Sequence, residues 1–197
     1  MKNRPDAILY PWALLLVLSL LTAAGCKEAY TPKPRAFFRI DFPEKKYRTF
    51  SGDCPYAFEY PVYGNIVDYA GKDAEPCWKN IQFPQYKGTI YLTYKPVSNN
   101  LAVYTEDIRI LAYKHIIKAD DIIDKPFHYP ERHVYGMIYD IRGNTASSIS
   151  FFATDSMHNF LSGSLYFSVP PNIDSLSPVI GFFKEDIMHL IETLTWN

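Results

Sequence analysis

The feature that most constrains this chain is an apolar run near its start that ends in a cysteine. The run begins near Ile8, follows the basic residues Lys2 and Arg4, and closes with small residues before Cys26. Its length of about 16 apolar residues is short for a membrane-spanning helix and typical of a signal peptide. The part of the chain that follows Cys26 is therefore predicted to be a soluble, folded body.

A cysteine directly after small residues is the pattern of a bacterial lipoprotein. In such proteins the thiol, here that of Cys26, receives a diacylglycerol, the peptide is cut before it, and the new amino end is acylated. Three acyl chains would hold the protein on a membrane almost permanently, because each buried CH₂ contributes about 0.8 kcal/mol. Ala23 stands where the pattern prefers Leu or Val, so two alternatives stay open: an ordinary signal peptide with a chance cysteine, and an uncleaved anchor.

The predicted organisation is a lipoprotein signal peptide over residues 1–25, a Pro-containing tether over 26–36 and a single globular domain over 37–197. Pro32 and Pro34 favour an extended, stiff tether. Cleavage before Cys26 would leave 172 of the 197 residues, which is enough for one domain with a real core.

Composition separates several function classes. With 48% hydrophobic and 21% charged residues, the chain is typical of a globular protein, and its 16% aromatic share favours a sheet-rich fold. A net charge of −1 argues against a nucleic-acid binder, which normally has a basic surplus. It also argues against electrostatic attachment to anionic lipid, so membrane residence would depend on the acyl chains.

Two cysteines remain if Cys26 is lipidated. Cys54 and Cys77 are expected to pair as a disulfide, because exported chains meet an oxidising compartment. The bridge would close a loop of 23 residues and contribute about 3 kcal/mol in the chain-entropy model. The alternative is two buried free thiols. No second Cys or His lies two to four residues from either cysteine, so no metal site is predicted.

Hydrophobic alternation predicts a mostly antiparallel sheet. The predicted strands cover residues 56–62, 66–69, 77–83, 88–96, 134–141, 146–154 and 159–169. A turn signal at Gly64-Asn65 predicts that 66–69 pairs back on 56–62 as a hairpin. The segment 124–133, with two prolines, is expected to be a loop.

Two amphipathic helices complete the prediction. The first begins after a cap at Asn99 or Asn100, and the second begins at Ser177-Pro178. Their apolar stripes comprise Leu101, Tyr104, Ile108, Leu111 and His115, with Val103, Ile110 and Ile117 beside them, and then Phe183, Ile187, Leu190, Ile191 and Leu194. Both helices are expected to bury a face, and the first a broad one. The fold class is therefore α+β, a mostly antiparallel sheet packed against two amphipathic helices, and its element order resembles the PsbP type of sandwich.

The search for catalytic motifs gives one polar cluster, formed by His128, Glu131 and His133. These residues could form a metal or acid–base site, and the alternative is a solvated loop. The Asp120-Asp121 pair is expected on the surface at a helix C-terminus. Phosphate loops, zinc helices and nucleophile elbows are absent from the sequence. No catalytic residue, metal or cofactor is predicted, and the chain is not expected to be an enzyme.

Two segments rich in aromatic residues and proline, 37–43 and 60–63, allow two interpretations. They could form a docking surface, because exposed aromatic residues are frequent at interfaces. Alternatively they pack against the body, with 37–43 lying across it or covering a sheet edge.

Several stretches resemble the GldD family, the gliding-motility lipoproteins of the Bacteroidota. They are YTPKPR (30–35), FRIDFP (38–43), GSLYF (163–167), PPN (170–172), DSL (174–176) and PVI (178–180), with further likeness in the closing helix. The resemblance implies a lipid-anchored, non-enzymatic envelope component needed for gliding and linked to type IX secretion. It carries over one functional residue, Cys26, as the site of lipid attachment.

The partners implied by this resemblance are the membrane, through the N-terminal lipid, and other gliding or secretion envelope proteins, with no nucleic acid. Lys27 is not the Asp that marks inner-membrane retention in enteric bacteria, which favours the outer membrane, facing the periplasm. The alternative function is a periplasmic module that binds a lipid or a glycan in a cleft between helix and sheet.

Overall fold

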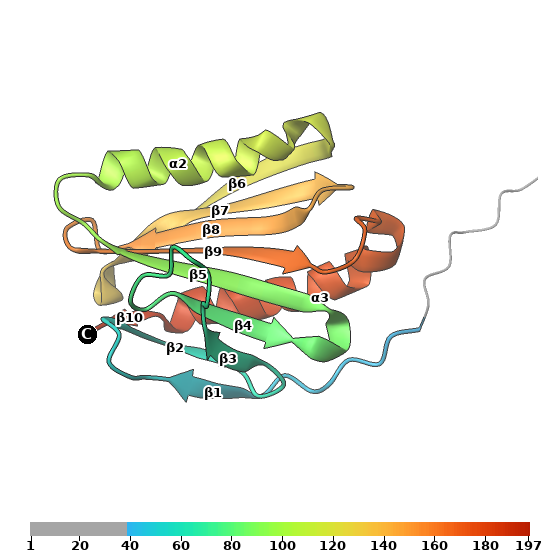
Figure 1. Cartoon of the computed structure of the whole chain (residues 1–197), viewed down its shortest axis with the longest axis horizontal. Coiled ribbons are helices and arrows are strands. Elements are labelled where there is room, and N and C mark those ends of the chain that lie inside the picture. The colour runs from blue at the N-terminus through green and yellow to red at the C-terminus, as the bar shows by residue number, and fades with distance from the viewer. Residues whose placement is uncertain (1–38) are drawn as a thin grey trace, which may run out of the picture. The chain divides into compact units, whose positions relative to one another are not determined.

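Two antiparallel sheets and two long helices make up the fold (Figure 1). The structure is a computed structural model that describes residues 39–197. The large sheet has the order β3 (Asn65–Asp68), β4 (Lys79–Phe83), β5 (Gly88–Pro96), β9 (Asn159–Phe167), β8 (Ser147–Thr154), β7 (Val134–Gly143) and β6 (Ala119–Tyr129). The small sheet has the order β1 (Tyr47–Phe50), β2 (Tyr56–Pro61) and β10 (Thr195–Trp196).

The two helices, α2 (Leu101–Tyr113) and α3 (Ile173–Thr193), lie on opposite faces of the large sheet. Strand β8 shows the division, because successive residues of a strand point to opposite faces. Phe151 packs into the main core with Phe183 of α3, whereas Phe152 packs against a smaller cluster that contains Ala112 of α2. The small sheet adds Phe58 to the main core, so it covers the same face as α3. The predicted α+β class is confirmed.

Helix α3 buries the stripe that the sequence predicts. All five of its predicted apolar residues are buried, together with Val179. The helix begins at Ile173, one turn before Ser177-Pro178, so the predicted start is wrong. The Ile173 backbone N–H donates to Asn144 Oδ1 in the β7–β8 turn at 2.8 Å, and this distant side chain stabilises an earlier first turn.

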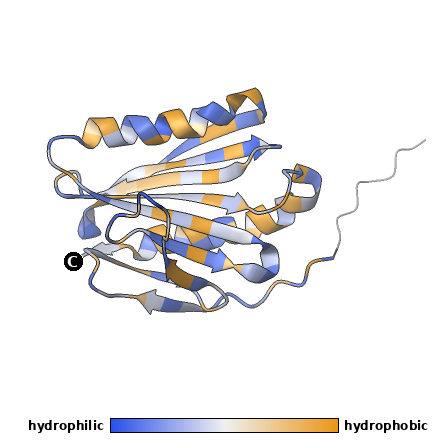
Figure 2. Ribbon diagram, viewed as in Figure 1, coloured by the Kyte–Doolittle hydropathy of each residue, from blue (hydrophilic) through white to orange (hydrophobic). Residues whose placement is uncertain are grey.

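Helix α2 corrects the expectation of a broad buried face. Its one fully buried residue is Ala112, while Leu111 is 51% exposed and Val103 and Ile110 are exposed as well. Ile117, in the 3-10 turn η2 (Lys114–Ile117), is 90% exposed. Figure 2 shows hydrophobic residues along α2, and several of them are the exposed residues just named. Asn100 precedes the helix, but its side chain makes no capping hydrogen bond.

The predicted hairpin between 56–62 and 66–69 is also wrong. Strand β3 pairs with β4 in the large sheet, whereas β2 pairs with β1 and β10 in the small one. The chain crosses between the sheets at Gly64, where a Cβ would come within 2.8 Å of the Phe83 ring. Glycine therefore serves a close approach between backbone and core here, rather than a hairpin turn.

The segment expected to be a loop belongs to a strand and a short turn. Residues 124–129 are the second half of β6, and η3 (Pro130–Arg132) joins β6 to β7. Strand β6 is at the edge of the sheet, where Pro126 is tolerated because an N–H that faces solvent has no ladder partner. Asp120 and Asp121 lie at the start of this strand, beside a bulge, and not at a helix C-terminus.

The two sheets are joined covalently. Cys54, just before β2, and Cys77, just before β4, form a disulfide with their Cα atoms 5.5 Å apart. This is the pair that the sequence analysis expected. Tyr56 reinforces the connection, because its hydroxyl donates to the Cys77 carbonyl at 2.7 Å.

Of the aromatic segment 37–43, the described residues pack against the body. The Phe42 ring stacks on Phe182 of α3 at 4.3 Å and lies 5.8 Å from Tyr86 in η1 (Pro84–Tyr86). In the segment 60–63, Tyr60 is buried and Tyr63 packs on Phe182. Packing is therefore the main role of the aromatic residues described here.

Candidate functional site

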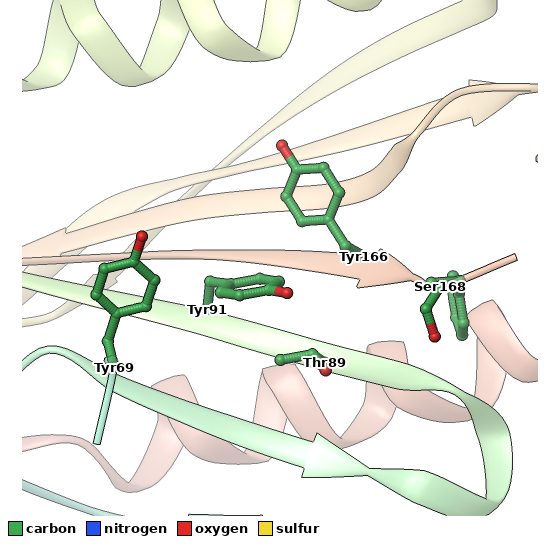
Figure 3. Close-up of a pocket in the computed structure, with 6 residues that line it drawn as sticks. Tyr69, Thr89, Tyr91, Tyr166 and Ser168 are labelled. Atoms are coloured by element: carbon green, nitrogen blue, oxygen red, sulfur yellow. The ribbon is translucent and has the colours of Figure 1, made fainter. Parts of the chain in front are cut away.

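One half of a sheet face has no helix over it. Helix α2 lies over the β6–β8 side of the large sheet and reaches the start of β9, where Tyr104 packs on Phe160, and in Figure 1 the same face is uncovered over β4, β5 and the end of β9. An open groove of about 490 Å³ lies there, lined by Tyr69, Thr89, Tyr91, Tyr166, Phe167 and Ser168. Figure 3 shows these side chains, which we refer to as the open groove.

Strand alternation explains why the groove is aromatic and rich in hydroxyls. Along β5, Ile90 and Leu92 point into the main core, so Thr89 and Tyr91 point to the other face. The neighbouring strand β9 places Tyr166 opposite Thr89 in the register. The sequence pattern that builds the core therefore also builds the outer face.

A second hollow continues the open groove toward the disulfide. It has a volume of about 210 Å³ and shares Tyr69 and Tyr91 with the first, adding Trp78, Asn80 and Thr93. The Asn80 side-chain oxygen is buried and has no hydrogen-bond partner among the described residues. A buried acceptor without a partner is unfavourable, so this oxygen is a natural site for a donor from outside the chain.

A third hollow lies where α2 meets the sheet. Its volume is about 250 Å³, and it shares Trp78 and Thr93 with the second hollow before reaching Tyr104 and Leu111 on α2. Lys95 and Asp107 also line it, and they are the charged residues of the three hollows. The three hollows are therefore neighbours, and no charged residue lines them except at the α2 end.

Ring contacts hold the groove in shape. Tyr91 and Tyr166 meet edge to face with ring centroids 5.7 Å apart, and Tyr69 and Trp78 lie 5.7 Å apart. Such pairs contribute about 0.5–1.5 kcal/mol beyond the area they bury. The exposed rings of the groove therefore form an ordered surface.

The groove hydroxyls differ from those in the core. Within residues 39–197, the hydroxyls of Tyr69, Tyr91 and Tyr166 make no hydrogen bond. In contrast, Tyr56 donates to Cys77 and Tyr94 donates to Asn159. Burial, with a smaller effect of Tyr91, raises the pKa of Tyr166, so its hydroxyl remains a neutral donor at neutral pH.

The structure does not bring His128, Glu131 and His133 together as a metal site. The His128 ring lies 4.9 Å from the Tyr135 ring at a tilt of 40°, and Glu131 pairs with the adjacent Arg132. His133 has a left-handed backbone with φ of 52° that ends η3, and its carbonyl accepts a hydrogen bond from the Trp196 ring. No group of three or more metal-ligating side chains occurs in the described part of the chain.

Other predicted residues lie apart from the groove. Cys54 and Cys77 are in the disulfide, and Cys26 lies outside the described residues. Between residues 39 and 197, no helix combines the length and the apolar content needed to span a bilayer.

The structure contains a buried ionic cluster around Asp186 that the sequence did not predict. Asp186, in the middle of α3 and 1% exposed, accepts from Lys45 Nζ at 2.7 Å, from Tyr63 at 2.7 Å and from Tyr47 at 3.0 Å. Burial first, and then the Asp186 carboxylate, raises the pKa of Tyr63. The spacing contained a signal, because Asp186 follows the core residue Phe183 by three positions and so lies on the same helix face.

The comparison with known families decides the identity. The model of the family described as "Gliding motility lipoprotein GldD" matches residues 27–196. The chain belongs to the GldD family. It is therefore a lipoprotein of the cell envelope that takes part in gliding motility, as the resemblance of its motifs implies. The family is described by this role and not by a chemical reaction.

Comparisons outside the family add less. No curated protein sequence matches this GldD protein. Among solved structures it is similar to cyanobacterial PsbP (CyanoP) from Synechocystis sp. PCC 6803, with a TM-score of 0.49 and 11% sequence identity. The similarity covers 79% of this chain and 95% of the PsbP chain.

Proposed function

We propose that this GldD protein is a structural or assembly component of the gliding machinery, linked to type IX secretion and held on the outer membrane by a lipid on Cys26. The family match over residues 27–196 carries this proposal. The anchor follows from the signal peptide over 1–25 and the small residues before Cys26. The body, over 37–197, would face the periplasm at the end of the tether 26–36.

The fold is compatible with a non-catalytic role. Among the described residues, the predicted histidines and glutamate are engaged in turns and ring contacts and do not face a common cleft. The hydroxyls of Ser150 and Ser164 bond to each other at 2.9 Å, so these serines form a link between strands.

The test compares a clean deletion with a strain that carries Cys26→Ala. Both strains are expected to lose colony spreading and to retain secreted type IX cargo in the cell. The Cys26→Ala protein should also leave the membrane fraction and fail to capture envelope partners in a pull-down. Lys27→Ala, which leaves the cysteine and the residues before it intact, is the matched control and should behave as the wild type.

Separate results would contradict separate parts of this proposal. A deletion strain that glides and secretes normally would remove the role in the machinery. A Cys26→Ala protein that stays on the membrane and supports gliding would remove the role of the lipid. Fractionation that recovers the wild-type protein with the inner membrane would contradict the outer-membrane location and leave the other parts of the proposal standing.

The second candidate function is a periplasmic binding module. The core between α3 and the large sheet is filled by buried side chains, which leaves no room for a lipid there. The open groove and its two neighbouring hollows, on the opposite face, support a binding role instead.

A further inference from the structure

We propose that the open groove, with its two neighbouring hollows, binds a neutral glycan. This inference goes beyond the assembly role and does not depend on the lipid anchor. It rests on the shape, charge and hydrogen-bonding state of one face of the large sheet.

The shape suits an extended ligand. The three hollows share residues and follow β5 from Thr89 to Lys95. Six residue steps of a strand span about 20 Å, which accommodates a chain of several sugar residues.

The chemistry of the lining matches a sugar ring. A pyranose has apolar C–H faces and a rim of hydroxyl groups. Tyr69, Tyr91 and Trp78 offer ring surfaces to such faces, while Thr89, Thr93 and the tyrosine hydroxyls offer donors and acceptors to such rims. The unpartnered Asn80 oxygen adds a buried acceptor for a sugar hydroxyl or an acetamido N–H.

The charge distribution disfavours other polymers. Neither of the two hollows that contain Tyr91 is lined by Lys or Arg, so there is no counter-charge for a phosphate backbone or for anionic lipid headgroups. Of the residues that line the three hollows, the one lysine is Lys95, and it lies at the α2 end together with Asp107.

The backbone disfavours an added peptide strand. Strands β5 and β9 pair with each other over the full length of β5, β8 pairs with the other edge of β9, and β4 pairs with β5 from Gly88 to Leu92. Peptides that extend a sheet need a free strand edge, and the open groove lies over the part of β5 that is paired on both sides, at Thr89 and Tyr91. Recognition here must therefore use side chains, as a glycan requires.

The test uses the full-length, lipidated protein in a zwitterionic detergent, because detergents with sugar headgroups would compete. Soluble oligomers of N-acetylglucosamine and of glucose are titrated by calorimetry, with tryptophan fluorescence, to which Trp78 and Trp196 both contribute, as a second signal. At least one series is expected to bind, with affinity that rises with oligomer length up to several sugars.

Variants locate the binding. Tyr91→Ala and Tyr166→Ala are each expected to weaken binding at least tenfold, and Tyr91→Phe should weaken it less because the ring remains. Tyr135→Ala, which removes a partly exposed tyrosine that contacts His128 and does not line the groove, is the matched control and should bind normally. Circular dichroism confirms that each variant is folded.

Three outcomes would overturn the assignment. The first is no binding of either oligomer series at millimolar concentration. The second is binding that Tyr91→Ala and Tyr166→Ala leave unchanged. The third is capture of phospholipid vesicles or of an extended peptide, in place of sugars, that is lost in the same two variants. None of these measurements depends on gliding. A failure to bind glycans would therefore not contradict the proposed role in the gliding machinery, which the deletion strain tests separately.

Discussion

Asp186, a buried carboxylate in α3, attaches the segment around Lys45 and Tyr47 to the helix. Lys45 Nζ is shared between the Asp186 carboxylate and the Phe182 carbonyl, 2.7 Å from each, and it lies 3.4 Å from the centre of the Phe182 ring. Tyr47, in β1, and Tyr63 complete the hydrogen bonds. A buried carboxylate needs such partners, because an unpaired charge in the interior is strongly unfavourable.

A double-mutant cycle on this pair is expected to be strongly non-additive. Asp186→Ala leaves Lys45, which is 24% exposed, without its carboxylate and should lower the free energy of unfolding by about 3 kcal/mol. Lys45→Met leaves the carboxylate buried and unpaired, so a similar loss is expected. The double variant should lose far less than the sum, because no unpaired charge remains. Urea denaturation measures all three, and additive losses would refute the coupling.

Two further carboxylates predict a loss of stability in acid. Burial raises the pKa of Asp140, but hydrogen bonds from Lys184 and Lys125 outweigh it and hold that pKa below its usual value. Asp155 shows the same balance, since the backbone N–H groups of Met157, His158 and Asn159 donate to its carboxylate and lower its pKa.

Because both pKa values are lowered by folding, the folded state binds fewer protons than the unfolded chain. Their contribution is therefore fully present above the unfolded pKa of about 3.9 and is lost as the pH falls through the lower folded values. Asp155→Asn should reduce stability at pH 7 and flatten its fall below pH 4, measured by thermal unfolding across pH. Met157→Ala, in the same turn, is the control, and an unchanged slope in Asp155→Asn would contradict the assignment.

At the scale of elements, the two helices differ in how much they bury. Helix α3 lies between the large sheet and the small one, so residues such as Phe183 and Ile187 are covered on several sides. Helix α2 packs against the large sheet on one side only, and Ala112 is its one fully buried residue. Both sequences have amphipathic spacing, but the spacing cannot show whether a second layer exists.

Substitutions on α2 and on the η2 turn that follows it should distinguish the exposed side of this segment from the side that packs on the sheet. Leu111→Ser and Ile117→Ser are expected to change the midpoint of thermal unfolding very little, because both side chains are already half or more exposed. Ala112→Leu should lower the free energy of unfolding by about 1–3 kcal/mol, because a larger side chain cannot fit against Tyr139 and Ile141. A large loss in Leu111→Ser would show that this face is covered in solution.

At the scale of the whole molecule, the disulfide links the two sheets. Cys54 precedes a strand of the small sheet and Cys77 a strand of the large one, so the bridge crosses the boundary between them. The hydrogen bond from Asn197 Nδ2 to the Cys54 carbonyl brings the C-terminus to the same place. Asn197 is thus attached beside the disulfide.

Removal of this bridge should destabilise the folded state without changing its architecture. Cys54→Ala combined with Cys77→Ala is expected to lower the free energy of unfolding by about 3 kcal/mol, because the unfolded chain regains a loop of 23 residues. The reductant-treated wild type should match this variant, and reductant should not affect the variant itself. Equal unfolding midpoints for oxidised wild type and variant would contradict a stabilising bridge.

Strands were the most predictable part of the fold. The segment 88–96 alternates β-branched and aromatic residues, and β5 has those bounds. The stripe of α3 was equally clear. The errors fall at segment ends and edges: the hairpin at Gly64, the strand β6 with Pro126 and the start of α3. In each case a contact with a distant residue, or a position at a sheet edge, outweighed the local signal.

The groove could not be predicted as a site, although its residues were visible. The alternation along 159–169 placed Ser164 and Tyr166 on one face, but nothing local shows that α2 covers only part of that face. The position of α2 depends on packing with Tyr139 and Ile141, far along the chain. The groove therefore exists because α2 leaves part of the sheet face uncovered, and only the tertiary structure decides where α2 lies.

The sequence by itself determined the class of fold, seven of the ten strands that the structure describes, the stripe of α3 and the family, because periodic spacing and short motifs act within a few residues. Only the tertiary structure decided which faces are covered, which strand is at an edge and where Asp186 finds its partner, 141 residues away in Lys45. The physical reason is that burial requires a second surface. That surface comes from parts of the chain whose position no local pattern specifies.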